Sequence, residues 1–364
     1  MIANTFTDFS SLPDSARRLF VQATEHSVFL APVWFELLAE KVFSKANAQV
    51  ICAMQGEQCL AAVPVIPASQ GWVRQLSGLS NYYASYFSPV IADTGDTGEA
   101  LAVIAKAIRE AKPGWDILDF QPMPHDDPIF GAWQKALRQA GFSVQDYYCF
   151  GNWFLRLDGH TFKEYYDGLS SRLKNTIKRR RKKLEKQAQL SLRIFSGTDE
   201  LEEAIAHYQQ IYAASWKQDE PYPAFVPGLI RMGARQGWLR LGMAYVDGQP
   251  AAAQIWLIHA GIANIYKLAY DEKFAEFSVG SILSLLLFEQ AIDQDKVWEV
   301  DYLTGDDNYK KDWMSHRRER WGLMAFNTHR PMGLLAMMRH TVPRRIKQLL
   351  GRADNTGSTA TNSL

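Results

Sequence analysis

Three aspartates and one tyrosine near the C-terminus have the chemistry for proton transfer: Asp301, Asp306, Asp307 and Tyr309. An alkylammonium must lose a proton before its nitrogen can attack a carbonyl carbon, and a carboxylate can accept that proton. A tyrosine hydroxyl can then return a proton to the leaving group. We expect Asp301 to be the base, because it lies within the predicted strand over residues 297–303.

Each of these side chains also has a structural interpretation. Asp301 could cap a turn or pair with Lys310, and Tyr309 could be a packed aromatic residue. The sequence shows no nucleophile elbow and no Cys–His signature, so we expect no covalent intermediate. No histidine pair has the spacing of a metal site, so we expect no metal.

The elements that must position these residues are a strand, a polar loop, an apolar helix and a second strand, expected over 262–270, 271–278, 282–292 and 297–303. The helix is opened by Ser278, Val279, Gly280 and Ser281. The N–H groups of a first helical turn lack partners within the helix and can hold an anion such as a pyrophosphate. We expect Ser278 to cap the helix and Gly280 to let a ligand approach the backbone.

The motifs of this stretch are more specific together than any one glycine, and they comprise Tyr270-Asp271, Ser278-Val279-Gly280, Asp301-Tyr302, Gly305, Tyr309-Lys310 and Trp313. In these motifs the chain resembles the GNAT acyltransferase superfamily, in its FemAB-like branch. That branch includes CelD-like cellulose-associated acetyltransferases and bacterial ceramide synthases. Val279 departs from the proline usual in the family, so the turn there is expected to be less rigid.

The resemblance implies a binding set for an acyl-CoA cosubstrate. Besides the residues that open the helix, this set includes Lys267, Tyr270 and Lys310. A backbone N–H along residues 267–270 is expected to polarise the thioester carbonyl. The resemblance also implies an α/β fold of tandem GNAT-like domains, with mixed, mostly antiparallel sheets flanked by helices.

The predicted elements divide the chain into four parts, namely a degenerate N-terminal GNAT-like domain over 1–158, a basic linking helix over 159–190, an acyltransferase domain over 191–352 and a disordered tail over 353–364. Two hairpins are expected, one around the turn at Gln55-Gly56-Glu57 and one around Asp247-Gly248.

Composition narrows the class of protein. The chain has 364 residues, a hydrophobic content of 47% and a formal net charge of +1, which argues against a general nucleic-acid binder. Its 3 cysteines have no metal spacing and suggest a reducing compartment. Without an apolar signal core, we expect a cytoplasmic protein that is either soluble or peripheral to the inner membrane.

Two basic segments are each compatible with more than one binding partner. The predicted helix within 161–190 carries nine lysines and arginines and suits a solvated bridge, a phosphate, an anionic lipid or a tRNA. Residues 331–350 combine leucine and methionine with arginine, which suits either an interfacial segment or packing on the domain.

We therefore expect an N-acyltransferase that uses acyl-CoA or an acyl-carrier protein. The expected acceptor is the amine of an envelope lipid precursor, a long-chain base as in a ceramide synthase. One alternative keeps the fold and takes an aminoacyl-tRNA as donor, which is the only nucleic acid we expect. Another is a CelD-like acetyltransferase or silent adaptor of polysaccharide biosynthesis.

Overall fold

The computed structural model describes residues 1–7, 9–43 and 48–340. Its helices are α1 (Asp14–Thr24), α2 (Pro32–Lys41), α3 (Thr97–Glu110), α4 (Pro128–Gln139), α5 (Phe162–Gly168), α6 (Ser171–Glu185), α7 (Leu201–Ala213), α8 (Phe225–Arg235) and α9 (Val279–Glu289). Short 3₁₀ turns include η2 (Val28–Leu30), η3 (Glu272–Phe277) and η5 (Lys310–Asp312).

The strands are β1 (Ile2–Phe6), β2 (Gln49–Gln55), β3 (Gln58–Gln70), β4 (Val73–Gly78), β5 (Val90–Ile91), β6 (Ile117–Pro124), β7 (Ser143–Arg156), β8 (Leu190–Phe195), β9 (Leu239–Val246), β10 (Gln249–His259), β11 (Ile262–Tyr270), β12 (Glu299–Asp301) and β13 (His316–Phe326). They form one sheet in the order β1-β2-β3-β4-β6-β13-β7-β12-β11-β10-β9-β8, with β5 beside β3. Only the pairs β4–β6 and β11–β12 are parallel among these strands. The expected α/β fold with a mostly antiparallel sheet flanked by helices is confirmed.

Both expected hairpins are present, and their turn residues explain why. Strands β2 and β3 pair around Gly56, which has a positive φ of 60°. Strands β9 and β10 pair around Asp247 and Gly248, whose φ angles are 50° and 75°. Aspartate and glycine tolerate this left-handed backbone, whose twist matches that of the flanking strands.

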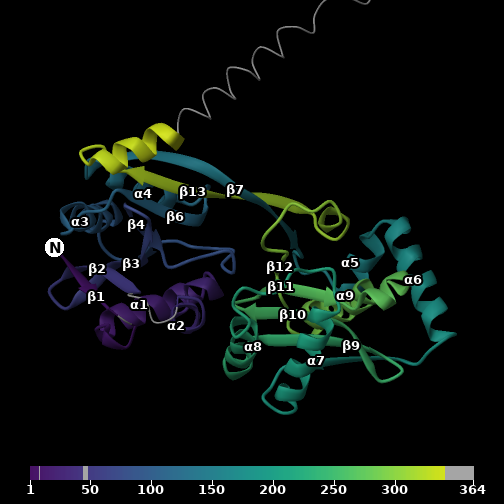
Figure 1. Ribbon diagram of the computed structural model, residues 1–364. Coiled ribbons are helices and arrows are strands. Elements are labelled where there is room, and N and C mark those ends of the chain that lie inside the picture. The colour runs from purple at the N-terminus through teal and green to yellow at the C-terminus, as the bar shows by residue number, and fades with distance from the viewer. Residues whose placement is uncertain (8, 44–47, 341–364) are drawn as a thin grey trace, which may run out of the picture.

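The two halves of the chain share the middle of the sheet. The last strand, β13, lies between β6 and β7, so it joins the sheet of the N-terminal half. Figure 1 shows β7 and β13 running from the N-terminal half, in purple and blue, toward the green strands of the C-terminal half. The division of the chain at residue 158 therefore stays a proposal.

The halves also meet through helices. Helix α2 packs against α8, where a Cβ on Gly228 would lie 2.8 Å from Leu37 Cδ1, so any larger residue would require the Leu37 side chain to shift. Phe225 of α8 stacks on Tyr83 with ring centroids 4.0 Å apart, and Trp34 meets Phe225 edge to face. One apolar core thus joins α1 and α2 to α7, α8 and the strands β9 and β10.

A second core holds α9 on the C-terminal sheet. Its helical face buries Ile282, Leu283, Leu287 and Phe288 against β9, β10 and β11. The helix begins at Val279, three residues before the expected start, and a π-helical turn over Gln290–Gln294 follows it. The described part of the chain has no helix long and apolar enough to cross a bilayer.

The expected amphipathic segment over 331–350 is described only in part. Residues 331–340 are helical. Residues 341–350 and the tail expected over 353–364 lie outside the described residues.

Candidate functional site

The first turn of α9 opens on a cavity of about 340 Å³, which we call the helix cavity. Ser278, Val279, Gly280 and Ser281 line it, together with Tyr270 of β11. No side chain caps this turn: Ser278 occupies the N-cap position with a left-handed backbone, but its hydroxyl makes no capping bond. The first-turn N–H groups are therefore available to an anion in the cavity.

Gly280 keeps this turn accessible. A Cβ at Gly280 would meet only Tyr270 Cδ1, at 3.7 Å, so alanine fits the protein here and would extend toward the cavity. The Gly280 carbonyl accepts hydrogen bonds from Gln254 Nε2 at 2.9 Å and Ser284 Oγ at 3.0 Å. The first bond ties the turn to β10, and the second lies within α9.

The strand beside this turn is unpaired on one edge. Strand β11 pairs with β12 only from Ile262 to Asn264, yet it continues to Tyr270. The structure brings this free edge, which includes Lys267, next to the helix cavity, since Leu268 and Tyr270 both line that cavity. Unpaired strand N–H groups can polarise a carbonyl oxygen.

A second cavity of about 350 Å³, the lysine cavity, adjoins the first. Its wall contains Lys217, Lys267, Lys310, Asp307 and Tyr83. The two cavities share four wall residues, Trp216, Leu268, Tyr302 and Tyr309. An uncharged space at a helix terminus thus opens toward a space lined by cations and a carboxylate.

Tyr309 lies at the junction of the two cavities. Its side chain is partly exposed and meets Tyr302 edge to face, with ring centroids 5.8 Å apart. Burial and the nearby Asp307 carboxylate raise the pKa of Tyr309 to about 12. At neutral pH the phenol is protonated and can donate a hydrogen bond.

Lys310 holds the loop that carries Asp307. Its ammonium donates to the carbonyl oxygens of Thr304, at 2.5 Å, and Gly305, at 3.2 Å, and lies 3.5 Å from the Asp307 carboxylate. Burial lowers the pKa of Lys310, although Asp307 opposes that shift. The Lys310 ammonium therefore has little donor capacity left for the ligand that it was expected to bind. The Asp307 side chain lines the lysine cavity.

The other two aspartates lie elsewhere. Asp306 accepts bonds from Arg317, at 2.8 Å, and Trp153, at 2.7 Å, and lines none of the cavities described here. Asp301 is buried, pairs with Arg318 and accepts from the Leu303 N–H at 2.6 Å. It borders a third cavity instead of the first two. Of the three aspartates, only Asp307 lines the lysine cavity.

Sequence reasoning missed two charged residues here: Lys217, which lines the lysine cavity, and Glu220, which pairs with the lining residue Lys267. Burial, reinforced by Lys267, lowers the pKa of Lys217 to about 8. Glu220 pairs with Lys267 and accepts from the Tyr83 hydroxyl at 2.5 Å. Burial raises the pKa of Glu220, but the bonds from Lys267 and Tyr83 outweigh burial and hold it below the ordinary value.

The only sequence signal near these residues is the loop over 219–227, rich in proline and aromatic residues. No local pattern connects the first residues of this loop with Lys267, because Glu220 and Lys267 are far apart in sequence. The described residues also contain no group of three or more His, Cys, Asp or Glu side chains that could hold a metal ion.

Comparison with known proteins identifies one segment of the chain. Residues 171–311 match the family model of the acetyltransferase (GNAT) domain, a segment that includes α6, α9, β11 and β12. No curated protein shows significant sequence similarity to the chain.

Solved structures share the whole fold. FemX has a TM-score of 0.61 at 10% identity, covering 91% of this chain and 99% of FemX. A tandem GNAT protein from the clavulanic acid biosynthesis pathway has a TM-score of 0.51 at 14% identity, covering 88% and 98%. The C-terminal domain of a candidate lysylphosphatidylglycerol synthetase from Agrobacterium fabrum has a TM-score of 0.52 at 12% identity, covering 89% and 96%.

At these identities the structural likeness establishes the fold, and the domain match carries the enzyme class. The domain match bears out the expected N-acyltransferase with a GNAT domain, and the fold is similar to those of FemX and of a tandem GNAT protein.

Proposed function

We propose that this protein transfers an acyl group from acyl-CoA, held in the helix cavity, to a polar amine held in the lysine cavity. One observation carries the proposal: the uncapped first turn of α9 opens on a cavity that shares Tyr309 with a second, charged cavity. A donor and an acceptor could therefore meet at Tyr309 from opposite sides.

The helix cavity suits the diphosphate of a CoA thioester. The N–H groups around Gly280 form the positive end of the α9 dipole, and they border this cavity. No charged side chain among the described residues lines the cavity. CoA supplies the activated thioester. The unpaired edge of β11 would place an N–H near the thioester carbonyl oxygen, where it stabilises the negative charge that develops during attack.

The lysine cavity suits the amine. Asp307 borders it and can take the proton that the ammonium must lose, directly or through a water molecule. The nitrogen then attacks, a C–N bond forms and the C–S bond breaks. Tyr309 donates a hydrogen bond to the departing sulfur, and the proton lost by nitrogen balances the proton gained by the thiol.

The cavity lining also bears on the acceptor. Lys217, Lys267 and Lys310 favour a polar acceptor with negative groups over the apolar chain of a long-chain base. The ceramide-like acceptor expected from the resemblance is thus our second choice. An acyl-carrier protein remains a candidate donor, since its thioester arm presents the same carbonyl and sulfur.

A second donor, an aminoacyl-tRNA, is favoured by one specific surface. Helix α6 packs against α9, and its exposed residues Lys178, Arg179, Lys182 and Lys186 form no ion pair among the described residues. This unpaired basic face lies near the donor end of the site and could neutralise RNA phosphates.

The test is an acyl-transfer assay with the purified full chain. Acyl-CoA of increasing chain length is offered with alkylamines, ω-amino carboxylates and sphinganine, while free thiol release and amide mass are recorded. The proposal predicts thiol release that depends on the amine, with a polar amine preferred. Transfer only from aminoacyl-tRNA, abolished by ribonuclease, would support the second donor, and no CoA binding by calorimetry would support a silent adaptor.

A further inference from the structure

A third cavity, of about 380 Å³, lies where the two halves of the chain meet, and we call it the arginine cavity. Its wall combines β13 residues Arg318 and Arg320 with Glu299 and Asp301 of β12. The segment around Asp126, before α4, closes another side. Side chains of Arg318 and Arg320 share one face of β13, because residues two apart on a strand point the same way.

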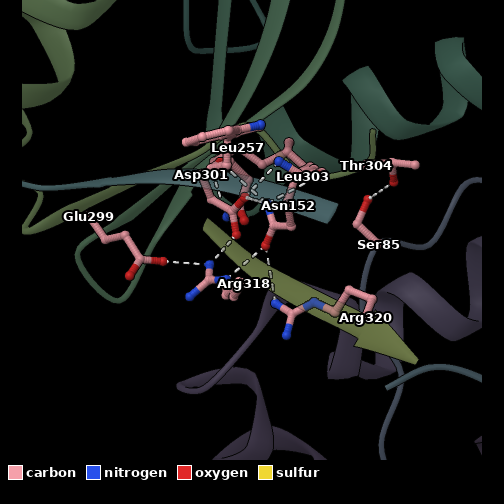
Figure 2. A network of polar contacts seen from close by, with 11 residues as sticks. Ser85, Asn152, Leu257, Glu299, Asp301, Leu303, Thr304, Arg318 and Arg320 are labelled. Atoms are coloured by element: carbon pink, nitrogen blue, oxygen red, sulfur yellow. Dashed lines mark hydrogen bonds and ion pairs between the residues drawn. The ribbon is translucent and has the colours of Figure 1, made fainter. Parts of the chain in front are cut away.

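The two arginines differ in their partners, as Figure 2 shows. Arg318 pairs with Glu299 at 2.7 Å and with Asp301, and it also donates to Asn152 Oδ1 at 2.7 Å. Burial opposes its charge, but Asp301 and Glu299 outweigh burial and raise the pKa of Arg318. Arg318 is therefore compensated within the protein.

Arg320 is not compensated. It is 6% exposed, and its recorded side-chain hydrogen bond is a long one of 3.5 Å from Nη2 to Asn152 Oδ1. Its Nε is buried without a partner, and no carboxylate of the described residues forms an ion pair with it. The guanidinium instead lies over the ring of Tyr86, 5.3 Å from the centroid.

The carboxylates of the cavity wall are otherwise engaged. Glu299 and Asp301 form ion pairs with Arg318. The Asp127 carboxylate caps α4 by accepting from the Ile129 N–H at 2.8 Å, and Glu25 lies 3.4 Å from His259. Asp126 is exposed at the edge. A buried guanidinium with free donors therefore faces the cavity without an anion of its own.

Such an arginine calls for an external anion. A guanidinium stays charged in proteins, and its planar fork of N–H donors matches a carboxylate or a phosphate. Leaving its charge buried and unpaired is unfavourable. Burial, together with the positive charge of Arg318, lowers the pKa of Arg320, which is the mark of a site short of negative charge.

The arginine cavity also adjoins the lysine cavity. Ser85 and Leu303 border both, and a hydrogen bond of 2.7 Å joins Ser85 Oγ to Thr304 Oγ1 at the divide. A ligand passing this point would reach from Arg320 to the junction at Tyr309.

We propose that Arg320 binds a carboxylate or phosphate of the acyl acceptor, while the amine of the same molecule lies in the lysine cavity. This inference rests on the proposed acyl transfer and names the class of acceptor: an amine with an anionic group at its far end. Arg320 thus selects the acceptor and takes no part in proton transfer.

The test compares Arg320→Met with Arg317→Met in the full chain. Arg317 lies on the same strand but pairs with Asp306 outside the cavity, so it controls for the loss of one arginine. Acceptors are ω-amino carboxylates, ω-amino alkylphosphates and alkylamines of matched length. The carboxylate and phosphate series distinguish the two anion sources.

The wild-type protein should prefer one anionic series over the alkylamines. Arg320→Met should lower kcat/KM for that series by about ten- to a hundredfold, the range expected for lost charge-assisted hydrogen bonds. Alkylamine acylation and CoA affinity should stay unchanged. The melting temperature should hold or rise, because an uncompensated buried charge is removed.

Binding is checked separately by thermal shift with inorganic phosphate and acetate. Stabilisation of the wild type and of Arg317→Met, but not of Arg320→Met, supports the site. Equal use of anionic and neutral amines by the wild type, or an equal loss in both variants, overturns the inference while leaving acyl transfer intact. Absence of CoA binding would instead overturn the proposed function.

Discussion

The helix cavity and the arginine cavity recognise anions by opposite means. The helix cavity offers backbone N–H groups from three consecutive residues, Val279, Gly280 and Ser281, because the Ser278 N–H donates to the Ala275 carbonyl. No charged side chain of the described chain lines it. The arginine cavity offers the guanidinium groups of β13. Carboxylates from β12 and from the segments before α2 and α4 line the same cavity. The residues of the helix cavity's anion site are consecutive in the sequence, whereas those of the arginine cavity come together only when the chain folds.

The two sites therefore differ in their cost to the stability of the protein. A helix terminus presents partial charges that need no counter-ion, so the helix cavity can stand open at little cost in stability. A buried arginine needs either a carboxylate, as Arg318 has, or a ligand, as we infer for Arg320. The charged cavity should therefore respond to substitution in stability, and the helix cavity mainly in binding.

The largest expected effect is on stability. Asp301→Ala leaves Arg318 without one of its two buried carboxylates and should lower the free energy of unfolding by about 3–5 kcal/mol. Asp307→Ala, at a side chain 62% exposed, should change it by no more than about 0.5 kcal/mol. Urea denaturation of both variants measures the contrast.

In acylation the order should reverse among molecules that remain folded. Asp307→Ala should slow transfer because the base at the lysine cavity is lost. If Asp307→Ala is fully active while folded Asp301→Ala is inactive, the sequence-based choice of Asp301 as base is right and our reassignment is wrong.

A smaller effect is expected at the junction. Tyr309→Phe removes the hydroxyl that faces the departing sulfur and should lower kcat about a hundredfold, with little change in KM for the donor. The matched control is Tyr148→Phe. It removes a partly exposed hydroxyl that accepts a hydrogen bond from Arg317 and lies outside the helix and lysine cavities. Steady-state kinetics decide: equal activity of the two variants would remove Tyr309 from the mechanism.

The smallest effect is on pH dependence. Folding lowers the pKa of Lys217 to about 8, so between this pH and the ordinary lysine value near ~10.4 the unfolded chain binds more protons. Through this group the free energy of unfolding should rise with pH in that window. Lys217→Met should remove the rise, and Lys178→Met on α6 should leave it in place. Urea denaturation at several pH values measures it, and an unchanged slope in Lys217→Met would contradict it.

The same comparison explains how far the sequence could lead. Turn chemistry at Gly56 and Asp247-Gly248 was enough for the hairpins, and a local motif was enough to predict α9. Local patterns operate over neighbouring residues, and both features depend on neighbours alone. The expected Ser278 cap was wrong, because Ser278 has a left-handed backbone and its hydroxyl makes no capping bond.

What could not be predicted depends on distant pairing. The charged run over 317–320 suits either surface ion pairs or arginines beside a ligand pocket. Nothing in the sequence shows that β13 enters between β6 and β7 and carries Arg318 and Arg320 inward. Asp301 was expected to be the base because it lies within the predicted strand over 297–303. Its actual direction is set by Arg318 and Asn152, which come from β13 and β7.

The central claim is that the first turn of α9 holds the diphosphate of CoA, and calorimetry with CoA and pantetheine, which lacks the diphosphate, tests it most directly. The wild type should bind CoA at least about tenfold more tightly than pantetheine, one charge-assisted hydrogen bond being worth that much. Gly280→Ala should bring this ratio close to one, while Gly131→Ala, in α4 with nothing within 4 Å of the new methyl, should keep it. The same ratio in all three proteins, or no binding of CoA to the wild type, would contradict the account.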